Sequence, residues 1–105
     1  MLIDVLKIAR DLLSRGWCQR HYVITPDGRA FWLKRFVDWK TLQTEGCRFC
    51  ALGALYAACN GDNDAECAAD MIRDMIGRGI TEWNDDVDRT KEEVLQVFDD
   101  VINSL

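Results

Sequence analysis

The sequence predicts a mainly α-helical protein with about four helices around a central apolar helix, and a β-hairpin inserted between helices one and two. Three observations carry this prediction. Residues 49–59 pass without a single charged side chain. Three other stretches repeat their apolar residues at helical spacing. One stretch of β-branched and aromatic residues is interrupted by a Pro-Asp-Gly turn.

The central helix is expected over residues 47–59. Its apolar run is too short to span a bilayer, which needs about 20 apolar residues. It also lacks the polar stripe of a surface helix, so we expect burial on all sides. Its small residues lie three or four positions apart and allow neighbouring backbones to approach closely; Asn60-Gly61 ends the helix.

Two further helices are expected over residues 2–15 and 64–76. Gly16 ends the first of them, and Gly77 ends the other. One of the polar residues at 62–64 is expected to cap the start of the second.

The last helix is expected over residues 90–105. It begins with a capping box, in which Thr90 and Glu93 satisfy each other's backbone donors. Residues 80–89, which precede it, are expected to form a loop.

The hairpin is expected within residues 21–36. Pro26-Asp27-Gly28 separates its two arms, because proline presets φ for the first turn position and glycine supplies the positive φ that closes the turn. A lone hairpin is marginal in water, so this one must lie on the helices or on another chain. Residues 37–46 read as a connecting loop.

Composition limits the class of protein. A chain of 105 residues, 49% apolar and 30% charged, is expected to form a single globular domain over 1–105. The start of the chain has no basic region followed by a cleavage site, and no segment is long enough to cross a membrane. The expected compartment is the cytoplasm.

The charge is unevenly distributed along the chain. The net charge is −5, but residues 1–60 carry +4 and residues 61–105 carry −9. This balance argues against a general nucleic-acid binder, which would present a basic face. Either the two halves attract each other in the fold, or the asymmetry serves binding, as an acidic face for a basic partner or a basic pocket for an anion.

Three landmarks in this order resemble a small uncharacterised domain family of bacteria and their phages. They are Gly16-Trp17-Cys18, the run Cys50-Ala51-Leu52-Gly53-Ala54-Leu55, and Trp83-Asn84-Asp85 followed by Thr90-Lys91-Glu92-Glu93-Val94-Leu95. The resemblance covers most of the chain. It implies a fold and a phage or prophage origin, and therefore the cytoplasm of a bacterial host cell, but no established activity.

The cysteines allow more than one interpretation. Five cysteines in a chain without a secretory signal favour free thiols. Cys18 with His21 and Cys47 with Cys50 have spacings that suit a zinc site, although Cys50 can equally be a core residue or contact Cys18 as a thiol or disulfide. Cys18 and His21 could also pair as nucleophile and base, but the sequence shows no orienting group or oxyanion hole. The protein is therefore more readily read as a non-enzyme.

Aromatic, basic and amide side chains provide the candidate binding site. Trp83 either anchors its loop on the core, with the following Asn and Asp side chains organising the turn, or takes part in a ligand site. Tryptophan and arginine around the hairpin suit a protein interface or the stacking of a base. The candidate binding residues are Trp17, Arg20, Trp32, Arg35, Trp39, Trp83, Asn84 and Asp85.

The sequence thus favours a small non-enzymatic interaction module that engages a host protein, and a counter-defence inhibitor is one such role. The alternatives are a binder of a small anionic ligand such as a nucleotide, and a zinc-binding or cysteine-dependent domain. No cofactor is expected unless the zinc alternative holds. Direct nucleic-acid binding and membrane binding are not expected, and a homo-oligomer remains open.

Overall fold

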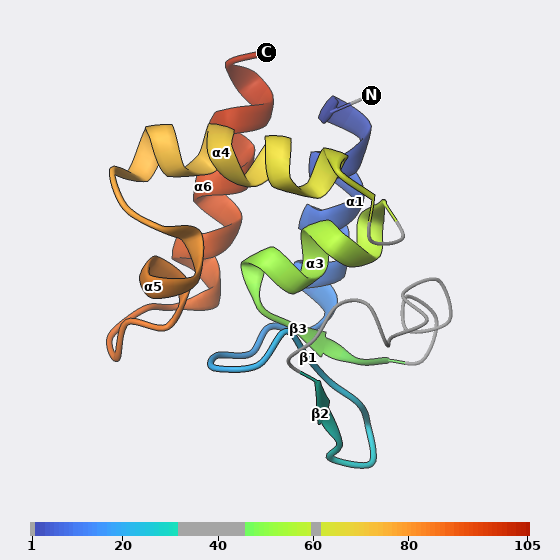
Figure 1. Ribbon diagram of the computed structural model, residues 1–105. Coiled ribbons are helices and arrows are strands. Elements are labelled where there is room, and N and C mark those ends of the chain that lie inside the picture. The colour runs from blue at the N-terminus through green and yellow to red at the C-terminus, as the bar shows by residue number, and fades with distance from the viewer. Residues whose placement is uncertain (1, 32–45, 60–61) are drawn as a thin grey trace.

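The computed structural model describes residues 2–31, 46–59 and 62–105, and in these ranges the chain is mainly helical (Figure 1). The helices are α1 (Leu2–Arg15), α3 (Ala51–Ala58), α4 (Asp64–Ile76), α5 (Ile80–Asn84) and α6 (Lys91–Asn103). Three two-residue strands, β1 (Val23–Ile24), β2 (Ala30–Phe31) and β3 (Arg48–Phe49), form one sheet in the order β2-β1-β3. The predicted fold class is confirmed.

Helix α3 occupies the centre, as its charge-free sequence predicts. It packs against α1, α4 and α5, and β3 leads directly into it (Figure 1). Alanines and a glycine make up most of its buried surface, together with Leu55 and Tyr56. Because these side chains are small, neighbouring elements can pack close to the helix backbone on several sides.

The structure corrects the start of this helix. The prediction of helix from residue 47 is wrong, because Arg48 and Phe49 form β3, which pairs antiparallel with β1. The Phe49 N–H donates to Gly16 O at 3.0 Å, and the Cys18 N–H donates to Phe49 O at 2.9 Å. These long-range backbone hydrogen bonds hold the segment extended until Cys50, which is the N-cap of α3.

The hairpin is confirmed for its first arm and turn. Val23 pairs with Phe31 and Ile24 with Ala30. Gly28 adopts φ +90° and donates its N–H to Thr25 O at 2.9 Å, which closes the turn as predicted. The rest of the second arm and nearly all of the expected loop over 37–46 lie outside the described residues.

Outside α3, the helix boundaries follow local signals except at the starts of α4 and α5. The predicted end of α3 at Asn60-Gly61 lies outside the described residues. The Thr90–Glu93 capping box is present, and Gly77 ends α4 at φ +78°. Asn63 is the N-cap of α4 but makes no side-chain cap hydrogen bond. The prediction of a loop over 80–89 is wrong at its start, because residues 80–84 form α5.

An ion pair joins α1 and α6. Arg10 on α1 donates through Nε and Nη2 to the two carboxylate oxygens of Asp99 on α6, at 2.9 and 3.1 Å.

Within the described part of the chain, no helix combines the length and apolar character needed to cross a membrane.

Candidate functional site

Asn84, the last residue of α5, is completely buried and lies against the N-terminal end of α3. Its Oδ1 accepts from Trp17 Nε1 at 2.8 Å and from the Ala51 N–H at 3.0 Å. Its Nδ2 donates to Cys18 O at 3.2 Å and to Asp85 Oδ1 at 2.9 Å. One amide therefore joins the segment after α1, the first turn of α3 and the end of α5.

The segment after α1 is also attached to the turn after α5. Gln19 Nε2 donates to Asn84 O at 3.0 Å and to Asp86 O at 2.7 Å. The Arg20 N–H donates to Asp85 Oδ1 at 2.8 Å. Arg20 holds a φ of +73°, a left-handed conformation that favours glycine. These contacts hold the two loops side by side, although the paired residues are 65 to 67 positions apart in sequence.

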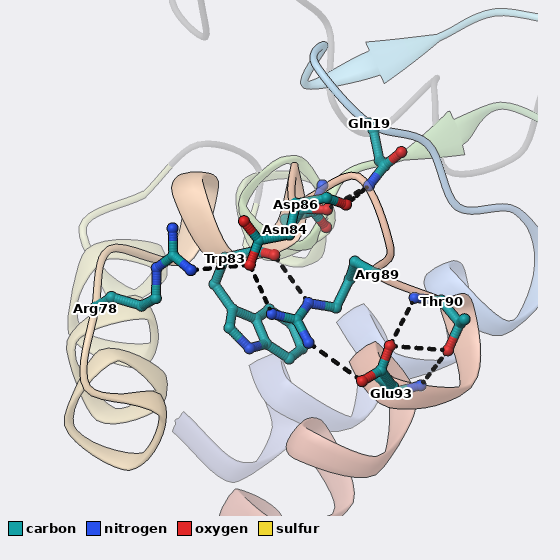
Figure 2. A network of polar contacts seen from close by, with 8 residues as sticks. All are labelled: Gln19, Arg78, Trp83, Asn84, Asp86, Arg89, Thr90 and Glu93. Atoms are coloured by element: carbon teal, nitrogen blue, oxygen red, sulfur yellow. Dashed lines mark hydrogen bonds and ion pairs between the residues drawn. The ribbon is translucent and has the colours of Figure 1, made fainter.

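Arg89 organises the other side of the same turn (Figure 2). Its guanidinium lies 4.0 Å from the centre of the Trp83 ring, within the range of a cation–π contact. Nε donates to Trp83 O at 2.9 Å, Nη2 to Asp86 Oδ2 at 2.9 Å and Nη1 to Glu93 Oε2 at 3.2 Å. Arg78 donates to the same Asp86 oxygen at 2.8 Å. All of these groups serve to hold the turn.

The two cysteines among the landmarks are buried beside this network. Cys50 Sγ accepts from the Gly53 N–H at 3.2 Å and so caps α3. The Cys18 thiol donates to His21 O at 3.5 Å and to Arg48 O at 3.7 Å. Burial raises the pKa of both thiols to about 12. At neutral pH both remain protonated, whereas a nucleophilic cysteine needs its thiolate.

The zinc alternative finds no support in this arrangement. Cys18, His21, Cys47 and Cys50 all lie in the described ranges, and in those ranges no three or more Cys, His, Asp or Glu side chains are grouped to hold a metal ion. The sulfur atoms of Cys18 and Cys50 hydrogen-bond to backbone groups.

Five of the eight candidate binding residues gather at the N-terminal end of α3. They are Trp17, Arg20, Trp83, Asn84 and Asp85. The other three, Trp32, Arg35 and Trp39, lie outside the described residues. Trp83 is only 8% exposed, which matches the interpretation of an anchor on the core rather than an open ligand contact.

Sequence reasoning did not select Gln19, Arg78 or Arg89, although these side chains complete the network. Arg89 carried only a weak local signal: Glu93 stands four residues after it, and the two side chains form an ion pair. The sequence around Gln19 and Arg78 shows no such signal, because only the folded chain brings their hydrogen-bond partners close to them.

The arrangement is suited to holding backbone in place rather than to moving protons. The side-chain polar atoms of Asn84 and Arg89, and Nε2 of Gln19, all hydrogen-bond within the protein. Two open surface hollows lie nearby. One of about 260 Å³ lies between α4 and α5, and one of about 400 Å³ lies along the turn before α6.

Nearly the whole chain matches a known protein family. Residues 2–104 match a family of unknown function, DUF6197, and the chain belongs to this family. No curated protein and no solved structure matches the chain.

Proposed function

We propose that this chain is a small non-enzymatic interaction module that binds a basic protein partner through an acidic face formed by α4, α5 and α6. One observation carries the proposal: residues 61–105 contain thirteen acidic and four basic side chains. Helix α4 contacts both α5 and α6, and the three helices lie away from the hairpin (Figure 1).

The acidic side chains of this face point outward. Its exposed carboxylates belong to Asp64, Glu66, Asp70, Asp74, Glu82, Asp88, Glu92, Glu93 and Asp100. The three arginines of the same half are already in ion pairs: Arg73 with Asp70, and Arg78 and Arg89 with Asp86. A surface with this excess of negative charge attracts a basic partner and accelerates their encounter.

A non-enzymatic role is supported by the state of the most reactive groups. Cys18 and Cys50 are buried thiols with a pKa of about 12, so neither supplies a nucleophile at neutral pH. The amide of Asn84 is fully used in holding α3 and its neighbours.

A more specific proposal concerns the organism from which the protein partner comes. The landmark residues resemble a domain family of bacteria and their phages, so we propose that the partner is a protein of the bacterial host. An acidic phage protein that occupies a basic surface of a defence protein would act as a counter-defence inhibitor.

Quantitative pull-down from bacterial lysate tests the proposal. The wild-type chain should retain a stoichiometric protein partner, and raising the salt concentration should release it because exposed charges are screened. The variant Asp74→Asn/Glu82→Gln, which removes two carboxylates that pair with no described residue, should lose this partner.

The matched control is Asp4→Asn/Asp11→Asn on α1, which changes the net charge equally away from the acidic face. It should retain the partner. Equal capture by both variants, or release of the partner by the control alone, would contradict the assignment of the acidic face.

A further inference from the structure

The turn between α5 and α6 borders a surface groove of about 400 Å³. The groove is lined by Asp86, Val87, Asp88, Arg89 and Glu93. Val87 is 85% exposed, whereas the other large apolar side chains that stand out from the described surface are 43% to 56% exposed. One wall of the groove therefore offers an aliphatic side chain to solvent.

The remaining lining is acidic. Three carboxylates face one guanidinium, and that guanidinium is already neutralised by its contacts with Asp86 and Glu93 and by stacking on Trp83. Asp88 is exposed and forms no ion pair or hydrogen bond with any described residue. It is the carboxylate most available to an incoming cation.

The turn is held in place before any partner arrives. Gln19 binds its backbone at Asn84 and Asp86, and the Arg89 N–H donates to Asp86 O at 3.0 Å. Figure 2 shows these side chains converging on the turn. Since the loop needs little further ordering, binding to it costs less conformational entropy than binding to a free loop.

We infer that this groove receives a lysine or arginine side chain of the protein partner, an inference that rests on the proposed function. Long basic side chains bury an aliphatic stem and keep a charged head in a polar environment. Val87 contacts the stem, and Asp88 pairs with the head. The groove thus supplies a specific anchor within the wider acidic face.

Titration of the ¹⁵N-labelled full chain with a capped hexa-arginine peptide tests this. The amide signals of residues 86–88 and 93 should shift, while a hexa-glutamate peptide should leave them unchanged. The variant Val87→Ser/Asp88→Asn should weaken peptide binding about tenfold, since it removes both the apolar contact and the charge.

The matched control is Asp4→Asn/Ile8→Ser on α1, away from the acidic face, which also removes one exposed carboxylate and one exposed apolar side chain. It should change peptide affinity by less than about twofold. The inference is overturned if the peptide does not bind, if the shifts map elsewhere, or if the two variants weaken binding equally.

The lysate experiment separates this inference from the wider proposal. Suppose that Asp74→Asn/Glu82→Gln loses the partner while Val87→Ser/Asp88→Asn keeps it. The inference that the groove anchors the partner is then contradicted, whereas the proposal of binding through the acidic face is supported. If the groove binds the peptide but neither variant affects capture from the lysate, the groove is a site for basic side chains and the proposed function is contradicted.

Discussion

Asn84 uses two acceptor and two donor positions inside the protein, the full capacity of an amide side chain. One of its partners is the Ala51 N–H in the first turn of α3, where a helix has backbone donors without helical acceptors. Cys50 caps the same turn through its sulfur atom. A side chain from a distant element thus contributes to the start of the central helix.

Replacing Asn84 with alanine should lower the free energy of unfolding by about 3 kcal/mol, because several buried polar groups lose their partner. Urea denaturation followed by tryptophan fluorescence measures the change. Asn63→Ala is the control, since this exposed asparagine makes no side-chain cap hydrogen bond. A loss below about 1 kcal/mol at Asn84 would show that water replaces the lost contacts.

The cysteines should differ strongly in reactivity. Cys67 is exposed on α4, whereas Cys18 and Cys50 are buried with a raised pKa. Brief iodoacetamide treatment of the native protein at about pH 8 should label Cys67 and spare the other two. Mass spectrometry of peptides locates the label, and labelling under urea provides the control. Fast native labelling of Cys18 would mean that its burial is frequently lost.

Among single residues, the sequence singled out Trp83, Asn84 and Asp85 but placed them in a loop, whereas Trp83 and Asn84 end helix α5 and Asp85 is its C-cap. It also did not show what these residues contact. The Asn-Asp pattern signals a turn because such side chains bond to nearby backbone. Contacts with Trp17, Cys18 and Ala51 cross 33 to 67 positions of the chain. Such pairs follow from packing, which no local pattern encodes.

At the scale of elements, the helices were predictable because their signals are local. Apolar spacing gave α1, α4 and α6, and the capping box gave the start of α6. The strand at residues 48 and 49 was not predictable, since the sequence Cys47-Arg48-Phe49-Cys50 carries no local signal that separates strand from helix. Pairing with β1 and with the backbone near Gly16 decides for the strand.

Gly53 marks the closest approach between two of these elements. A Cβ built on it would lie 1.9 Å from Tyr22 O, whose carbonyl also accepts from the Cys50 N–H. Gly53→Ala should therefore cost about 3 kcal/mol, because the backbone before β1 must move away from α3.

Thermal unfolding monitored by circular dichroism checks this. Gly79→Ala is the control, because a Cβ there meets nothing closer than 3.8 Å. It should cost less than about 1 kcal/mol, given the modest preference for glycine over alanine at a helix N-cap. Equal stability of the two variants would mean that the sheet moves freely relative to α3.

Glu93 makes the stability of α6 depend on pH. Hydrogen bonding from the Thr90 backbone N–H lowers the pKa of Glu93 below its usual 4.5. A lowered pKa stabilises the folded state above the usual value, and that contribution disappears as the pH falls through the lowered one. Glu93→Ala should therefore destabilise the protein at neutral pH and have less effect in acid.

Urea denaturation at a series of pH values measures this difference. Glu92→Ala removes a carboxylate from the same helical turn without disturbing the capping box, so its neutral-pH effect should be smaller. A Glu93→Ala effect that persists unchanged in acid would show that the side chain acts through packing instead.

At the scale of the whole molecule, α3 connects the helices with the small sheet. It contacts α1, α4, α5 and β3, while strands of two residues cannot stand alone. The sheet and the helices should therefore unfold together. Tryptophan fluorescence and far-ultraviolet circular dichroism should give coincident urea transitions, and separate midpoints would show that the hairpin region unfolds independently.

The sequence by itself determined the helical class, the central helix, the hairpin turn and the unequal charge of the two halves, because each depends on neighbours in the chain. Only the tertiary structure decided that Asn84 joins three segments, that β3 precedes α3, and that Gln19 fixes the turn after α5. Those features arise from contacts between residues far apart in sequence, and the geometry of packing alone selects them.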